Sequence, residues 1–192
     1  MIDRRECMIN ELFISKCKEV FEEQNKKEIL DEQISALQSI MGRDVIEEYR
    51  YILNNYSSVF LREKYGLCSK YKSPMADEKG EEPFLYFIGL EGKDNIFLTY
   101  EMYKEQLPNS YFPIALADGG NVICISNNSE YIYLWIHDDI KNKPYKIFDS
   151  IEEMIMMIKK YEYEEKEIGV ISENVVLSEE FFAALNALKN KK

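Results

Sequence analysis

The chain has 192 residues, of which 46% are hydrophobic, and this length and composition predict one compact unit with additions rather than two independent domains. Its formal net charge of −11 argues against direct binding to nucleic acid, whose phosphates are bound by clustered lysine and arginine, and favours a basic partner. The sequence has no run of about 20 apolar residues that could cross a membrane and no apolar secretory segment near its start, so we expect a cytoplasmic protein without membrane attachment.

Three amphipathic helices are predicted in the first third of the chain. Apolar residues recur on one helical face from about Arg4 to Glu23, and Asp3 and Glu6 have the spacing of a capping box at its start. A second helix carries an apolar stripe and ends at Gly42. Its stripe consists of Leu30, Ile34, Leu37 and Met41.

The third helix follows this glycine corner directly. Asp44 and Glu47 form a second candidate capping box, and Tyr49 lies on a broad apolar stripe that continues to Tyr56. We expect the two helices that meet at Gly42 to cover one face of a sheet.

Two strands, a loop and a short helix are predicted in the middle of the chain. Ser58–Leu61 and Phe84–Leu90 have the apolar character of strands. Between them, Lys70–Pro83 contains proline, glycine and several charges, which is typical of an exposed loop that is mobile or contacts a partner. A short helix is predicted at Tyr100–Gln106, because the following Leu107-Pro108 disfavours its continuation.

A three-stranded meander is predicted next, from three runs rich in β-branched and aromatic residues. The runs are Tyr111–Ala117, Val122–Ile125 and Tyr131–Ile136. Asp118–Asn121 and Asn127–Glu130 supply the turns between them. Gly119 and Gly120 are expected to adopt positive φ in a turn, since a phosphate loop would lead into a helix and these glycines lead into a strand.

The rest of the chain is predicted to contain two strands and two helices. Tyr145–Phe148 is a short strand, and Ser150 and Glu153 form a capping box for the helix that follows. This helix is predicted to continue through Ile158 to Tyr161, because its apolar side consists of Ile151, Met154, Ile155, Ile158 and Tyr161. A strand at Ile168–Leu177 and a helix at Ser178–Lys189 are expected in the tail.

The sequence offers little for catalysis. His137 is the only histidine, and no serine or cysteine motif that marks a nucleophile lies near it. Adjacent strand residues point to opposite faces, so His137, Asp138 and Asp139 would make a poor metal site. The cysteines lack the spacing of a zinc site or a disulfide framework, and reduced, mostly buried thiols are expected at Cys7, Cys17, Cys68 and Cys124. We therefore predict no enzyme activity, no cofactor and no metal.

The only tryptophan, Trp135, can belong either to the core or to an interface. Strand alternation places Tyr131, Tyr133 and Trp135 on one face of their strand and the aliphatic residues between them on the other. The aliphatic face is expected to join the core. The aromatic face is either covered by a helix or forms a binding surface, because tyrosine and tryptophan often anchor protein interfaces.

Several of these segments together resemble the SUKH superfamily, which includes fungal cell-wall synthesis regulators and many bacterial immunity proteins. Four segments carry the resemblance: Leu107-Pro108, a strand that ends in alanine and Asp118, the run Gly119-Gly120-Asn121, and a strand that ends in Trp135, Ile136, His137 and Asp138. Gly42 and Tyr49 match the glycine and the helical tyrosine of the family's earlier corner. The family's Leu-Pro is replaced there around Asp44, and its Asn-Gly by Asn54–Ser57, so the chain resembles a divergent member.

The resemblance implies an α+β fold with a curved, mainly antiparallel sheet flanked by helices. It assigns residues 29–162 to this domain, with an N-terminal helical extension at 1–28 and a C-terminal extension with a terminal helix at 163–192. It also implies a non-catalytic protein-binding module, in bacteria commonly an immunity protein that neutralises a cognate polymorphic toxin, often a nuclease. Richness in Lys, Asn, Ile and Glu favours the bacterial branch, and the acidic balance would suit the basic cleft of a nuclease.

Two groups of residues are predicted to form or border the surface that binds the toxin. The first lies at the strand ends and consists of Asp118, Asn121, Trp135, His137 and Asp138. The second lies in the acidic loop and consists of Asp77, Glu78, Glu81 and Glu82. Two other functions are compatible with the sequence: an intracellular scaffold or regulator with a native host partner, and a domain that binds a small ligand in a pocket under the aromatic face.

Overall fold

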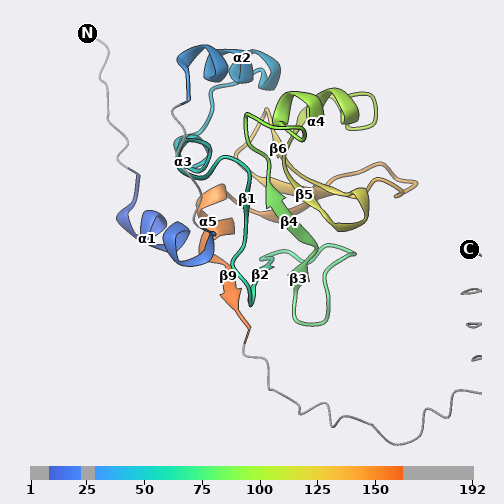
Figure 1. The fold of residues 1–192 in the computed structure, drawn as a ribbon. Coiled ribbons are helices and arrows are strands. Elements are labelled where there is room, and N and C mark those ends of the chain that lie inside the picture. The colour runs from blue at the N-terminus through green and yellow to red at the C-terminus, as the bar shows by residue number, and fades with distance from the viewer. Residues whose placement is uncertain (1–8, 23–28, 162–192) are drawn as a thin grey trace, which may run out of the picture. The chain divides into compact units, whose positions relative to one another are not determined.

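The computed structural model describes residues 9–22 and 29–161, and these form the predicted α+β fold (Figure 1). The helices are α1 (Glu11–Val20), α2 (Asp31–Met41), α3 (Glu47–Tyr56), α4 (Ile96–Tyr103) and α5 (Ile151–Met156), with a short 3-10 turn η1 (Asp118–Gly120). The strands are β1 (Val59–Phe60), β2 (Tyr65–Cys68), β3 (Glu81–Glu82), β4 (Phe84–Phe87), β5 (Tyr111–Ala117), β6 (Val122–Ser126), β7 (Ile132–Trp135), β8 (Tyr145–Phe148) and β9 (Ile158–Lys160).

Two antiparallel sheets organise the described residues. The larger has six strands in the order β1-β4-β5-β6-β7-β8, and the smaller has three in the order β3-β2-β9. Strands β5, β6 and β7 are the predicted meander. Gly119 and Gly120 have φ values of +71° and +79°, a region that glycine enters without the steric cost that a side chain adds. The prediction of a glycine turn between two strands is therefore confirmed.

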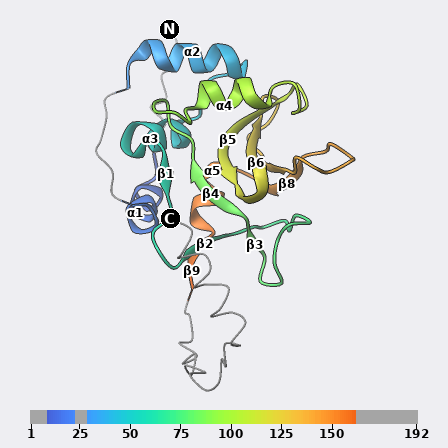
Figure 2. The same ribbon diagram turned by 45° about the vertical axis from the view of Figure 1, so that its right-hand side comes forward.

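The main core lies between the large sheet and the helices. Phe13 of α1, Leu37 of α2, Ile52 of α3 and Met154 of α5 are fully buried in it, together with Leu134 of β7. Helices α1, α3 and α5 lie beside one another in both views (Figures 1 and 2). The part of the predicted N-terminal extension that the structure describes therefore shares this core.

The start of the first helix differs from the prediction. Instead of running from about Arg4, α1 begins at Glu11, because the side chain of Asn10 caps it by accepting from the N–H of Leu12 (2.9 Å). The predicted capping box of Asp3 and Glu6 lies outside the described residues, as do Cys7 and the tail elements predicted at Ile168–Leu177 and Ser178–Lys189.

The predicted cap of the third helix is wrong. Ile46 occupies the N-cap position of α3 and makes no side-chain cap. The carboxylate of Asp44 instead accepts from Nε2 of Gln38 (3.1 Å), which bridges the corner at Gly42. Gly42 itself ends α2 with φ +67°, as the sequence predicted.

Two further helices have boundaries that the sequence pattern did not predict. Helix α4 begins at Ile96 rather than near Tyr100. Asn95 caps this helix, because its side chain accepts from the N–H of Leu98 (3.1 Å). Helix α5 has the predicted cap at Ser150, but it ends at Met156. The next residues form β9, which pairs with β2, so the prediction that the helix continues to Tyr161 is wrong.

Ser57 provides a test of local strain. It follows α3 with φ +56° and ψ −129°, a conformation that costs a non-glycine residue roughly 1–3 kcal/mol. We expect Ser57→Gly to raise the free energy of unfolding by about 1 kcal/mol, measured by urea denaturation. The same change at Ser35, an exposed residue inside α2, should lower it by about 0.5–1 kcal/mol. Equal effects at both positions would show that Ser57 carries no strain.

Candidate functional site

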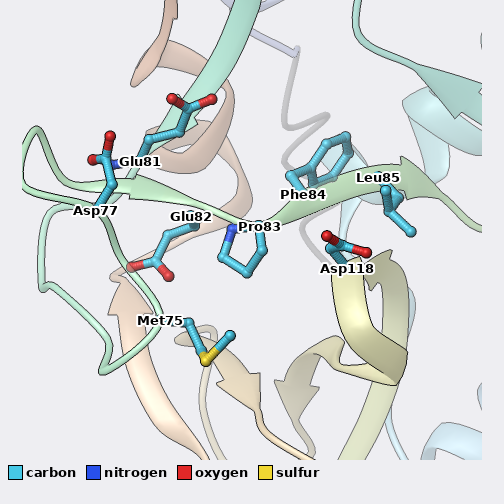
Figure 3. Close-up of a pocket in the computed structure, with 8 residues that line it drawn as sticks. All are labelled: Met75, Asp77, Glu81, Glu82, Pro83, Phe84, Leu85 and Asp118. Carbon is cyan, nitrogen blue, oxygen red and sulfur yellow. The ribbon is translucent and has the colours of Figure 1, made fainter. Parts of the chain in front are cut away.

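A pocket of about 330 Å³ lies where the segment before β4 meets η1 (Figure 3). The backbone N–H of Asp118 donates to the carbonyl of Pro83 (3.0 Å), which joins the two segments. We call this the acidic pocket; its lining consists of Met75, Asp77, Glu81, Glu82, Pro83, Phe84, Leu85 and Asp118. Four predicted site residues from both groups thus line one pocket, and this lining contains no lysine or arginine.

The loop that supplies most of the lining is held by its own hydrogen bonds. The backbone of Asp77 accepts from the N–H of Gly80 (3.0 Å), its carboxylate accepts from the N–H of Glu81 (2.8 Å), and Gly80 has the positive φ of +86° that this turn requires. Ser73 donates to the Glu82 carboxylate from its N–H (3.0 Å) and from its hydroxyl (2.6 Å). Glu82 is therefore only 2% exposed, although the sequence placed it in an exposed loop.

A charged cluster anchors the start of this loop to β8 and α5. Lys70 contacts the carboxylates of Asp149 (2.5 Å) and Glu153 (2.7 Å), and Lys146 also contacts Asp149 (2.5 Å). The Tyr71 hydroxyl donates to the same Asp149 carboxylate (3.2 Å). Asp149 thus receives two donors from the loop and one from β8, and Lys70 also links the loop to Glu153 of α5.

The anchor predicts a pH dependence. Hydrogen bonds from Lys146 and Lys70 lower the pKa of Asp149 from 3.8 to about 2. Because the pKa is lower in the folded state, the ionised carboxylate stabilises the fold above about pH 4, and this contribution is lost as the pH falls towards 2. In urea denaturation, wild type should be more stable than Asp149→Asn at pH 7, with a difference that shrinks from pH 4 to pH 2. A difference that stays constant across this range would contradict the role of Asp149.

Asn121 connects the glycine turn to the end of β7. Its side-chain oxygen accepts from the backbone N–H of His137 (3.1 Å), and its amide donates to the carbonyl of Asp118 (2.8 Å). Asn121 is buried at 2% exposure, whereas Asp118, His137 and Asp138 are exposed. The buried Asn121 side chain therefore joins the backbone of Asp118 to that of His137.

Trp135 lies in a second, smaller core cluster. It is 2% exposed and packs edge-on against Tyr103, with ring centroids 5.9 Å apart, and beside Leu107. Its indole N–H donates to Oδ1 of Asn142 (2.6 Å). The structure thus places Trp135 in the core, which is the first of the two positions that the sequence left open. At this burial, Trp135 can support a binding surface but has almost no area of its own to offer a partner. Tyr103 and Leu107 pack against Trp135 on this face, where the small-ligand alternative places its pocket.

The structure adds apolar residues that the sequence did not single out. Met75 is 46% exposed and Leu85 is 42% exposed, and both line the acidic pocket. A methionine inside an otherwise charged loop was the available signal for Met75. Glu78 is exposed on the same loop but does not belong to the lining.

The described residues show little catalytic chemistry. No group of three or more His, Cys, Asp or Glu among them is arranged to hold a metal ion. Cys17, Cys68 and Cys124 are buried free thiols, and burial raises the pKa of Cys17 to about 12, which disfavours the reactive thiolate. Nδ1 of the His137 ring lies 3.4 Å from Oδ1 of Asn121, which is an amide oxygen and not a nucleophile.

Comparisons with known proteins place these features in a family context. The pattern of the SMI1 / KNR4 family (SUKH-1) matches residues 28–157. The chain is also 28% identical over 120 residues to the SPbeta prophage-derived uncharacterized protein YokK of Bacillus subtilis (strain 168). This match covers 56% of the chain and 62% of that relative, so it spans less than two thirds of the relative's length. None of the described helices has the length and apolar character needed to span a bilayer.

Proposed function

The chain belongs to the SMI1 / KNR4 family (SUKH-1), and from this membership we propose that it is a non-catalytic immunity protein that neutralises a cognate bacterial toxin by binding it. The family typically binds partner proteins, and it includes bacterial immunity proteins. The prophage origin in the name of the relative favours the bacterial branch.

The acidic pocket is the observation that carries this proposal. Four carboxylates and several apolar side chains line it, and the residues that line it include no cation. A surface of this kind complements a basic surface on a partner and speeds the encounter of the two proteins. A nuclease domain, whose cleft binds phosphates through lysine and arginine, is the toxin class that this charge fits best.

Two features support inhibition by binding alone. The described thiols are buried, and His137 lies beside an amide rather than a nucleophile. Neutralisation would therefore come from occupying the toxin surface. A cytoplasmic location belongs to the proposal, because the protein must meet a toxin that acts on intracellular nucleic acid.

Affinity capture tests this proposal. The full chain, tagged and immobilised, is exposed to a lysate of its own host at low and at high salt, and the retained proteins are identified by mass spectrometry. We expect a large protein with a C-terminal toxin region that is retained at low salt and weakened at high salt. Retention of housekeeping proteins alone would favour the scaffold or regulator, and the absence of any retained protein would contradict a protein-binding function.

A further inference from the structure

Two carboxylates of the acidic pocket lie close to Pro83, and no counterion for either is found among residues 9–22 and 29–161. Glu82 and Asp118 flank the proline ring, whereas Glu81 points to the other side of the strand (Figure 3). Among the described residues, the Glu82 carboxylate accepts only from Ser73, and the Asp118 carboxylate accepts only from the N–H of Gly119 (2.8 Å). Neither carboxylate forms an ion pair within the part of the chain that the structure describes.

The burial of Glu82 makes this arrangement unusual. A glutamate that is 2% exposed normally has a positively charged partner, because a carboxylate removed from water loses its hydration. Ser73 supplies two hydrogen bonds, while a carboxylate can accept about four. Glu82 therefore retains acceptor capacity for a cation that approaches from the pocket.

The apolar part of the lining indicates the shape of this cation. Met75 is 46% exposed and Leu85 is 42% exposed, and Pro83 lies between the two carboxylates. Such a surface suits a chain of methylene groups that ends in a charged head. The volume of about 330 Å³ is at the small end of ligand sites, so it fits one side chain better than a large ligand.

We infer that the acidic pocket holds an arginine side chain of the partner protein, with its guanidinium between Glu82 and Asp118 and its stem against Met75 and Leu85. A planar guanidinium carries five donors and can bridge two carboxylates, whereas a lysine ammonium acts as a point charge. The inference depends on the proposed function for the source of the arginine; the recognition of a guanidinium rests on the pocket alone.

The first test uses an arginine probe and the full chain. The ¹⁵N-labelled protein is titrated with N-acetyl-arginine methylamide and, separately, with the nearly isosteric but uncharged N-acetyl-citrulline methylamide. A third titration uses N-acetyl-lysine methylamide. We expect saturable shifts of the backbone amides of Met75, Glu82, Leu85 and Gly119 with arginine, weaker shifts with lysine, and none with citrulline. Equal shifts with citrulline, or no saturable shifts with arginine, would overturn the inference.

Two isosteric variants identify the carboxylates. Asp118→Asn keeps an oxygen for the N–H of Gly119 and lies on the surface, so it should fold normally while weakening arginine binding by about tenfold or more. Glu82→Gln should have a similar effect. Glu130→Gln is the control, because Glu130 is exposed in the turn at the opposite end of β6 from Asp118, and it should leave the affinity unchanged. Equal weakening by all three would indicate general charge attraction and contradict a built site.

The captured partner separates this inference from the proposed function. If Asp118→Asn abolishes partner binding but arginine methylamide does not bind, the partner surface is correct and the arginine assignment is wrong. If arginine methylamide binds as expected but no toxin is captured, the pocket recognises guanidinium and the proposed immunity function is wrong.

Discussion

Replacing Trp135 by alanine is expected to lower the free energy of unfolding by about 3–5 kcal/mol, the usual cost of removing a large aromatic side chain from a core. Trp135 is 2% exposed and packs against Tyr103 and Leu107. The truncation would also leave Oδ1 of Asn142 without the indole donor that lies 2.6 Å from it. Urea denaturation followed by far-ultraviolet circular dichroism measures the change, since the variant has lost the only tryptophan of the chain.

Tyr131 provides the matched control for this prediction. It lies one residue before β7, is 42% exposed, and contacts Lys146, whose Nζ is 3.4 Å from the ring centroid. Removing this exposed cation–π contact by Tyr131→Ala should cost only about 0.5–1 kcal/mol. If Trp135→Ala were as mild as Tyr131→Ala and abolished partner binding, Trp135 would belong to the interface, contrary to its position in the structure.

Reversing three charges on the predicted binding surface is expected to weaken partner affinity by at least about a hundredfold. The variant combines Glu78→Lys, Asp118→Lys and Asp138→Lys, which all lie at exposed positions. Each lysine replaces attraction to a basic partner with repulsion, and the cost per close charge pair is of the order of 1 kcal/mol or more. Isothermal titration calorimetry with the captured partner measures the affinity.

A second triple variant controls for net charge. Glu63→Lys, Asp94→Lys and Glu130→Lys change the charge of the chain by the same amount at exposed positions outside the predicted binding surface. We expect a loss of less than about tenfold, mainly through slower association, because charges away from the contact act through the long-range field. Equal losses for the two variants would show that the interface lies elsewhere.

The meander could be predicted from the sequence because its signals are local. Gly119 and Gly120 permit the positive φ values of the turn, and the neighbouring runs alternate with the period of a strand. Gly42 predicted the end of α2 for the same reason. In each case, residues within a few positions of the feature determine it.

The smaller sheet could not be predicted, because it depends on contacts between distant segments. Ile158 pairs with Leu67, and Lys160 pairs with Tyr65. Ile158 continues the apolar stripe of the preceding helix, and its side chain would be buried in a longer helix as well as in a strand. The hydrophobic pattern therefore does not distinguish a helix from a strand at this position. Pairing with β2 is what makes this segment a strand.

The candidate site was predicted only in part, for a similar reason. The acidic loop and the glycine turn were identified separately, but their meeting through the N–H of Asp118 and the carbonyl of Pro83 is a tertiary contact. The burial of Glu82 arises from hydrogen bonds to Ser73, nine residues earlier in the chain. Composition alone cannot separate this carboxylate from the solvated ones around it.

Growth of cells that express the toxin is the most direct test of the central claim. The toxin region of the captured partner would be expressed from an inducible promoter in a heterologous host, alone, with the wild-type chain, and with the Glu78, Asp118 and Asp138 triple-lysine variant. We predict arrest with the toxin alone, growth with the wild-type chain, and arrest again with the variant at an equal level of folded protein. Arrest that persists with the wild-type chain would contradict the immunity function.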